Sequence, residues 1–322
     1  MSAFNKDGLN VTQLRLLDKL ERELGKHIID SLNNDDVIEI MLNPDGCLWI
    51  EKFGVGMECL CEFSPENAKS FMGTVANCLD TVINGETPIL EGELPYNGSR
   101  FEGLLPPVVT KPTFTIRKKA IKVFTLENYV EHNIVTERQK KIIEKAIIER
   151  KNILICGGTG SGKTTLTNAI IERISVLTPE DRIIVIEDTA EIQCNAKNKV
   201  ILRTTDMITM SRLLKATMRL RPDRILIGEV RGAEALDLLK SWNTGHPGGL
   251  ATIHANSAKA GLVRLEQLIS EATQSPMNKL IAEAINLVVF IAKTKTGRLV
   301  QEIISVKDFD IKNNNYIVEV II

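Results

Sequence analysis

The sequence predicts an α/β protein with two domains. The larger C-terminal domain is expected to be RecA-like, a parallel sheet with helices on both faces, and the smaller N-terminal domain to be α+β. The chain has 322 residues, which suits two domains better than one. Short β-like runs with turn signals fill its first third, whereas continuous apolar strands alternate with helices after it. We therefore expect domains at residues 1–118 and 119–322.

The N-terminal domain is expected to open with an amphipathic helix. Apolar residues recur at helical spacing from Val11 to Leu32, and the opposite face is charged. The favoured interpretation is a helix packed on its own domain or on a neighbour. The alternative is a helix on a membrane surface, although such helices usually carry an excess of basic residues.

Short strands and one further helix are expected to complete this domain. The runs DVIEIML, CLWIEKF and MECLCEF have β character, and the turn signal NPDG separates the first two. A helix over about residues 65–83 follows. Three more strands are predicted around ILEGELP, RFEGLLPPV and TFTIRKK, so antiparallel hairpins are expected.

The C-terminal domain is expected to begin with a capped helix. Thr136 and Gln139 have the spacing of a capping box, which predicts a helix from there to about Arg150. Apolar strands then alternate with helices. The predicted strands are NILIC, RIIVIED, RILIGEV, GLATIHA and LVVFIAKT.

Composition limits the classes of partner. The formal net charge is −1 and only 4% of residues are aromatic, so no direct sequence-specific binding to nucleic acid is expected. The six cysteines form no CxxC pair, which excludes zinc-ribbon spacing. The first ten residues lack the apolar core of a signal peptide, so reduced thiols are expected.

The most specific motif is GGTGSGKTT at residues 157–165, which matches the phosphate-binding loop GxxxxGK[ST] between a strand and a helix. Its glycines let backbone N–H groups surround a phosphate at a helix N-terminus. Lys163 is expected to reach the β- and γ-phosphates of ATP, and the Thr164 hydroxyl to bind Mg²⁺. The candidate nucleotide-binding residues here are Gly157, Gly158, Thr159, Gly160, Ser161, Gly162, Lys163, Thr164 and Thr165.

Hydrolysis also requires carboxylates near the last phosphate, and acidic residues follow two predicted strands. Glu187 and Asp188 end RIIVIED with Glu191 close behind, and Glu229 lies in RILIGEV. Parallel strands place their carboxyl ends at one edge, where ligands bind. One carboxylate is expected to hold the metal and another to orient or deprotonate water, but the sequence leaves the assignment open. The alternative is that Glu187 and Asp188 cap a following helix.

Two histidines occur in TGHPGGLATIHANSA, residues 244–258. His254 ends a predicted strand on the same edge as Lys163, and no third or fourth zinc ligand lies nearby in sequence. We expect His254 to hydrogen-bond the γ-phosphate or the attacking water. His246 precedes Pro-Gly-Gly and is expected either to bond within its loop or to assist the site.

These motifs resemble those of the secretion-ATPase superfamily, which drives type II and type IV secretion, pilus assembly and conjugation. GGTGSGKTTL resembles its Walker A motif and IVIEDTAEIQ its acidic box. RPDRILIGEVRGAEA resembles its Walker B motif, with Gly-Glu where most ATPases carry aspartate, and GHPGGLATIHANS resembles its histidine box. Within the superfamily the resemblance is to TrbB-type conjugative-transfer ATPases, supported by the compact length and the missing tetracysteine module.

The resemblance implies a homohexameric ring in which ATP and Mg²⁺ lie between the two domains of each subunit. It implies N-terminal arginines that reach the phosphates, and the segments SRFEGLLPPV and FTIRKKA make Arg100 and Arg117 the candidates. It also implies a cytoplasmic protein, peripheral at the inner membrane, with secretion or conjugation proteins as partners. Four further arginines are candidates for contacts between subunits or are surface charges, with a preference for Arg219: Arg203, Arg219, Arg221 and Arg231.

The expected function is therefore an ATP-driven motor for conjugative transfer, type IV secretion or pilus assembly. The catalytic candidates are Lys163, Glu187, Glu229 and His254, and the metal ligands Thr164, Glu187, Asp188 and Glu229. A type II secretion or pilus assembly ATPase is the nearest alternative. A nucleic-acid translocase would need a basic or aromatic channel, and a small-molecule kinase would leave the second domain and histidine box without a role.

Overall fold

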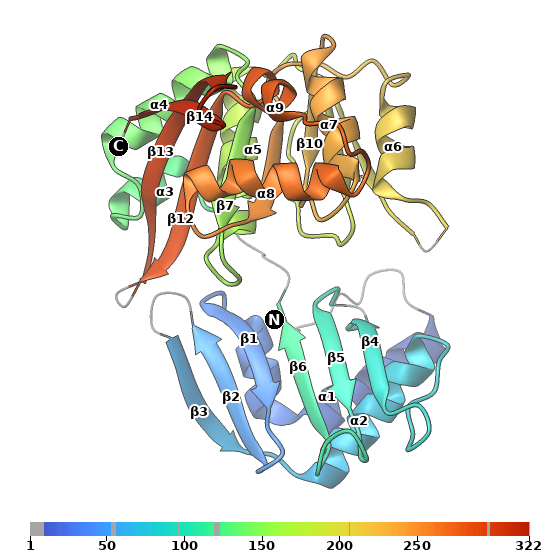
Figure 1. Cartoon of the computed structure of the whole chain (residues 1–322). Coiled ribbons are helices and arrows are strands. Elements are labelled where there is room, and N and C mark those ends of the chain that lie inside the picture. The colour runs from blue at the N-terminus through green and yellow to red at the C-terminus, as the bar shows by residue number, and fades with distance from the viewer. Residues whose placement is uncertain are drawn as a thin grey trace. The chain divides into compact units, whose positions relative to one another are not determined.

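The computed structural model describes residues 10–52, 56–95, 97–118, 123–205, 207–294 and 297–321. It divides the chain into two compact units, Met1–Lys122 and Val123–Ile322 (Figure 1). The domain boundary expected between residues 118 and 119 adjoins residues 119–122, which lie outside the described residues, and it stays a prediction.

The N-terminal unit contains a six-stranded antiparallel sheet with the order β3-β2-β1-β6-β5-β4. All six strands were expected from their short apolar or alternating runs. Their bounds are β1 (Val37–Leu42), β2 (Cys47–Lys52), β3 (Gly56–Glu62), β4 (Ile89–Glu93), β5 (Arg100–Leu104) and β6 (Thr113–Arg117).

Two helices cover one face of this sheet, α1 (Val11–Asn33) and α2 (Pro65–Cys78) (Figure 1). The apolar stripe of α1 is buried in the core of this unit, as the favoured interpretation predicted. It is therefore not available to bind a membrane surface. Gly25 interrupts α1 with a left-handed φ of 70°. The second helix ends earlier than predicted, at Cys78 instead of about residue 83.

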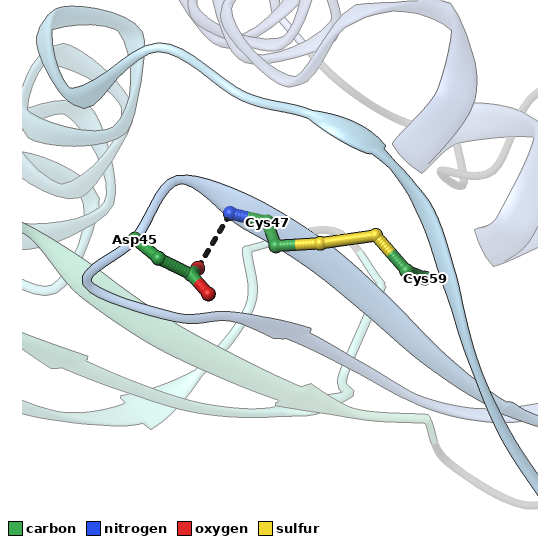
Figure 2. Close-up of a disulfide and its surroundings, with 3 residues drawn as sticks. All are labelled: Asp45, Cys47 and Cys59. Carbon is green, nitrogen blue, oxygen red and sulfur yellow. Dashed lines mark hydrogen bonds between the residues drawn. A yellow bond between two sulfur atoms is a disulfide. The ribbon is translucent and has the colours of Figure 1, made fainter.

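The expectation that all cysteines are reduced thiols is wrong for Cys47 and Cys59, which form a disulfide in the structure (Figure 2). The hairpin of β2 and β3 explains it, because antiparallel pairing places Cys59 opposite Trp49, near Cys47, with a Cα–Cα distance of 6.5 Å between the cysteines. The Asp45 carboxylate accepts a hydrogen bond from the Cys47 N–H at the start of β2 (2.8 Å). The other four cysteines are free, as expected.

The C-terminal unit contains an eight-stranded sheet with the order β14-β13-β12-β7-β11-β10-β8-β9. Six neighbouring strands, from β12 to β9, are parallel, and β13 and β14 extend the sheet as antiparallel strands. The bounds are β7 (Ile153–Gly157), β8 (Ile183–Glu187), β9 (Lys199–Arg203), β10 (Arg224–Ile227), β11 (Leu250–His254), β12 (Leu287–Thr294), β13 (Gly297–Asp310) and β14 (Asn315–Val320).

The sequence analysis missed three of these strands. It placed a helix directly after RIIVIED, but that segment continues as a loop into the edge strand β9, and a helix follows only at Met210. The alternative that Glu187 and Asp188 cap a helix is therefore wrong. The sheet is mixed, not purely parallel, because β13 and β14 form a hairpin on β12.

Helices cover both faces of this sheet, as predicted. In Figure 1, α7 and α8 cross in front of the strands and α5 lies behind them. The capping box of Thr136 and Gln139 is present at the start of α4. The helices are α3 (Leu126–Glu131), α4 (Glu137–Ile148), α5 (Lys163–Leu177), α6 (Met210–Thr217), α7 (Glu234–Asn243), α8 (Ala258–Ser270) and α9 (Asn278–Ala284). Among the residues described, no helix combines the length and apolar character that crossing a bilayer requires.

Candidate nucleotide-binding site

The phosphate-binding loop joins the end of β7 to the start of α5, in the context that the motif predicts. Gly160 and Gly162 have φ values of 68° and 93°, a left-handed conformation that favours glycine. Gly157 has no room for a side chain, because a Cβ there would collide with the Ser161 hydroxyl and the Ile291 carbonyl. The loop is thus a tight turn of backbone with its N–H groups at the N-terminus of α5.

Lys163 is only 7% exposed, and its ammonium group donates to the carbonyl oxygens of Gly157 and Gly158, both at 2.9 Å. The Ser161 hydroxyl is buried and has no hydrogen-bond partner among the described residues. A buried donor without a partner costs free energy unless a ligand satisfies it. The loop therefore fits a polyphosphate, which would accept from both side chains.

Four strand ends next to one another bring the remaining candidates to this loop. His254, the last residue of β11, pairs in register with Gly157 of β7. Thr252 in β11 donates from its hydroxyl to the Gly228 carbonyl (2.7 Å), which places the segment after β10 beside His254. Glu187 ends β8, and its Cβ lies near Gly228. The predicted convergence of acidic and histidine side chains at one sheet edge is present.

A chain of polar contacts runs from the loop to the acidic residues. Lys163 Nζ lies 3.3 Å from His254 Nδ1, and His254 Nε2 lies 2.8 Å from Glu229 Oε1. Arg231 donates from Nε and Nη2 to Glu229 Oε2, each at 2.5 Å. Its Nη1 lies 3.7 Å from Asp188 Oδ2. Glu229 is therefore held on one side by an imidazole and on the other by a guanidinium.

The imidazole of His254 is the neutral link in this chain. Burial and the positive charge of Lys163 lower the pKa of His254, and the opposing charge of Glu229 does not outweigh them. An ammonium group only donates, so Nδ1 must accept a hydrogen bond from Lys163. Nε2 therefore carries the ring proton and donates a hydrogen bond to Glu229. His254 thus links Lys163 to Glu229 through its two ring nitrogens.

Two glutamates near the loop have different partners. Glu187 is 2% exposed, and its Oε2 accepts from the backbone N–H groups of Glu191 (3.0 Å) and Ile192 (2.8 Å). Arg203 Nε lies 3.4 Å from the other oxygen. Glu191, by contrast, accepts from the Thr164 hydroxyl (3.3 Å). Glu187 shapes the acidic loop, while Glu191 is the carboxylate in contact with the predicted Mg²⁺ ligand Thr164.

The donor set fits Mg²⁺. Thr164 and Glu191 offer hard oxygen ligands beside a phosphate cradle, and Mg²⁺ typically binds through one or two protein oxygens, substrate phosphates and water. Among the described residues, no group of three or more His, Cys, Asp or Glu side chains is placed to hold a metal without substrate. The predicted metal ligands were Thr164, Glu187, Asp188 and Glu229. Asp188 accepts a hydrogen bond from the Thr204 hydroxyl (2.8 Å). The roles of Glu187, Asp188 and Glu229 as metal ligands stay predictions.

Several candidates lie away from this edge. His246 Nδ1 lies 3.0 Å from the Pro222 carbonyl, at the amino end of the sheet, so it bonds with a neighbouring loop and does not assist the site in this unit. Arg219 and Arg221 are exposed in the segment that leads into β10 at that same end. Roles for these two arginines between subunits stay predictions.

The sequence analysis did not single out Arg298 or Asn168. Arg298, in the unpredicted strand β13, donates from Nε to the Gly160 carbonyl (3.2 Å) and so buttresses the phosphate loop. Asn168 in α5 is buried, donates to the Glu191 carbonyl (3.1 Å) and accepts from the Gln193 N–H (2.9 Å). The position of Asn168 one helical turn after Thr164 was the available signal, whereas Arg298 carried none.

Arg100 and Arg117 are direct cross-strand neighbours on β5 and β6 of the N-terminal unit. Residues paired in this way point to the same face of a sheet. Glu39 on β1 is the next residue in the row, opposite Arg117. Burial raises the pKa of Glu39, although the charge of Arg117 opposes the shift. The two arginines therefore lie side by side on one face of this sheet, and their contact with phosphate stays a prediction.

Comparison with known proteins places the chain in one family. Residues 89–307 match the family model described as type II/IV secretion system protein. A probable conjugal transfer protein TrbB of Sinorhizobium fredii is 53% identical over 305 residues, covering 95% of this chain and 93% of that protein. A conjugal transfer protein TrbB of Rhizobium radiobacter is 51% identical over 310 residues, with 95% of each chain covered.

A solved structure supports the fold. The ATPase DotB of Legionella pneumophila is similar with a TM-score of 0.61 at 18% identity, over 92% of this chain and 80% of that one. The family model and the two TrbB relatives confirm the expected superfamily and the resemblance to the TrbB proteins. The chain belongs to the type II/IV secretion system protein family.

Proposed function

We propose that this chain is the ATPase of a conjugative-transfer or type IV secretion machine and that it converts ATP hydrolysis into mechanical work. The observation that carries the proposal is the direct contact of Lys163 with His254 and of His254 with Glu229, at neighbouring strand ends above a phosphate-binding loop. The relatives named for conjugal transfer support the biological setting.

Each side chain has a distinct task in this proposal. The loop and Lys163 bind the β- and γ-phosphates, and Lys163 exchanges its bonds to loop carbonyls for bonds to phosphate. Thr164 and Glu191 would hold Mg²⁺, which when bound neutralises charge on the phosphates. Glu229 orients the attacking water and accepts its proton. His254 donates a hydrogen bond to the terminal phosphate or hydrogen-bonds that water, and so distinguishes ATP from ADP.

We assign Arg100 and Arg117 to the phosphates as well. Guanidinium groups stabilise the charge that develops on a transferred phosphoryl group, and a mobile domain that supplies them couples hydrolysis to movement. A cytoplasmic homohexamer, peripheral at the inner membrane and bound to other secretion proteins, is the assembly proposed for this coupling.

The test combines particle imaging of the full chain with ATP and Mg²⁺ and an assay of phosphate release, with and without partner proteins. A six-fold ring that releases inorganic phosphate is expected. A monomer without turnover under every condition would contradict the proposal. Transfer of phosphate to an added metabolite would favour a kinase, and strong salt-sensitive stimulation by single-stranded nucleic acid would favour a translocase.

A further inference from the structure

Glu229 is bound by other side chains at both of its carboxylate oxygens. Its Oε2 accepts two N–H groups of Arg231 at 2.5 Å, and its Oε1 accepts from His254 at 2.8 Å. A carboxylate oxygen has two lone-pair sites, so Oε2 is filled. In this arrangement the oxygen bonded to Arg231 has no lone pair left for a proton from water.

The groups that hold Glu229 differ in how easily they move. His254 is 48% exposed at its side chain and is the last residue of a central strand. Arg231 is 58% exposed at its side chain and lies in the segment between β10 and α7. Exposed guanidinium ion pairs exchange at low cost because water solvates both partners. Arg231 is therefore the contact that can be released.

The backbone at Arg231 is fixed although its side chain is exposed. Glu234, in the first turn of α7, accepts from the backbone N–H groups of Arg231 (2.7 Å) and Gly232 (2.9 Å) through the same oxygen. A rotation of the Arg231 side chain therefore does not require the segment to move.

A second partner for the guanidinium is already within reach. Arg231 Nη1 lies 3.7 Å from Asp188 Oδ2, and the Thr204 hydroxyl fixes the other Asp188 oxygen at 2.8 Å. A small rotation carries the guanidinium from Glu229 to Asp188 without leaving it unpaired.

We propose that Arg231 is a positioning residue that holds Glu229 in a resting orientation, and that it must move toward Asp188 before the oxygen it occupies, Glu229 Oε2, can accept a proton from water. The proposal rests on the proposed role of Glu229 in ATP hydrolysis. It assigns Arg231 to control within its own subunit, as an alternative to the contact between subunits that the sequence left open. Arg231 touches no phosphate in this scheme, so its loss exposes Glu229 instead of removing a ligand.

The experiment measures steady-state ATP hydrolysis by the full chain with Mg²⁺, comparing wild type with Arg231→Gln, Arg231→Lys and the control Arg138→Gln. Arg138 is an exposed arginine on α4, so its exchange removes the same charge without touching Glu229 or His254. We expect Arg231→Gln to raise kcat about fivefold with an unchanged KM for ATP. Arg231→Lys should show a smaller rise, and Arg138→Gln none.

The pathway of the effect is tested by the double variant Arg231→Gln/Glu229→Gln, which must be as slow as Glu229→Gln alone. A rate in Arg231→Gln that equals the control, falls below wild type, or rises independently of Glu229 would overturn the proposal. Thermal unfolding checks the fold of each variant, and if Arg231→Gln does not fold, the rate of Arg231→Lys decides in the same way. Absence of hydrolysis in wild type would instead contradict the proposed function.

Discussion

The two ends of the C-terminal sheet each carry a cluster of arginine and carboxylate side chains, but the clusters differ in what they leave unsatisfied. At the amino end, Arg224 is 1% exposed and its guanidinium donates to Asp181 (2.6 Å), the Gly248 carbonyl (3.0 Å) and the Ile147 carbonyl (2.9 Å). Arg150 pairs with the other oxygen of Asp181. The three charged groups of this cluster are all paired within the protein.

At the carboxyl end one buried hydroxyl lacks a partner in the part of the chain that the structure describes, and one paired guanidinium stays exposed. Lys163 bonds with carbonyls of its own loop, the Ser161 hydroxyl lacks a partner among the described residues, and the side chain of Arg231 is 58% exposed. The comparison shows that charge at a strand end does not mark a site by itself. What marks the site is the presence of polar groups, such as the Ser161 hydroxyl, that a ligand could still bind.

The largest expected effect follows from Lys163→Ala, which removes a positive charge from the phosphates. We expect kcat for ATP hydrolysis to fall about a thousandfold, because the loop then lacks its contact to the β- and γ-phosphates. Phosphate release measures it, with Lys145→Ala as control because Lys145 is 75% exposed at its side chain on α4. Near-normal turnover of Lys163→Ala would contradict the assignment of the carboxyl end of the sheet as the nucleotide-binding site.

The matching change at the amino end is Arg224→Met, which should affect stability and not catalysis. Loss of one partner leaves Asp181 buried beside Arg150 alone, and removing one member of a buried pair costs about 3 kcal/mol of unfolding free energy. Urea unfolding measures it, and the ATPase rate of the folded variant should equal that of wild type. A variant as stable as wild type would show that this cluster is not a structural element.

Glu229→Gln should give a smaller catalytic loss. Glutamine keeps the shape and one acceptor oxygen but cannot accept a proton from water, so kcat should fall about a hundredfold while ATP binding persists. Fluorescent nucleotide binding alongside hydrolysis separates the two effects, with Glu283→Gln on the exposed face of α9 as control. Loss of binding would instead assign Glu229 to the metal.

The smallest effect concerns pH and the amino-end cluster. Burial alone would raise the pKa of Asp181, but the hydrogen bond and charge of Arg224 outweigh it and hold the pKa of Asp181 below its usual 3.8. The ionised carboxylate therefore stabilises the protein above pH 3.8, and this contribution is lost as pH falls through the lowered value.

Asp181→Asn tests this sign. Its unfolding free energy should lie about 2 kcal/mol below that of wild type at pH 7, and the gap should shrink below pH 3.8 as Asp181 of the wild type becomes protonated. Denaturant titrations at several pH values measure it. A gap that stays constant with pH would mean that Asp181 acts through packing and not through its charge.

Local patterns determined much of the fold and the core of the site. The phosphate loop, the capping box at Thr136 and the strands that end in Glu187 and His254 were all predicted. They could be predicted because each depends on neighbours within a few residues: glycine spacing, a cap, or a continuous apolar run. The order of parallel strand ends then brings His254 and Glu229 to Lys163.

Tertiary contacts decided what the local pattern could not. The strand β9 is a short edge strand with alternating exposure, and β13 and β14 gain their partners only when they pair on β12. The Cys47–Cys59 bridge depends likewise on the register of a hairpin. The runs EIISV in β13 and YIVEV in β14 were a local strand signal that the sequence analysis did not use, but their pairing partners depend on neighbours far away in sequence.

Tertiary contacts also decide which carboxylates and arginines are buried and which stay exposed. The sequence placed Glu187, Glu191, Arg224 and Arg231 next to strands but could not say which are buried or which partner each one finds. The fold turns Glu187 toward the N–H groups of its own loop, brings Glu191 to Thr164, encloses Arg224 and leaves Arg231 exposed. Burial and hydrogen-bond partners are properties of the assembled sheet, so only the tertiary structure assigns them.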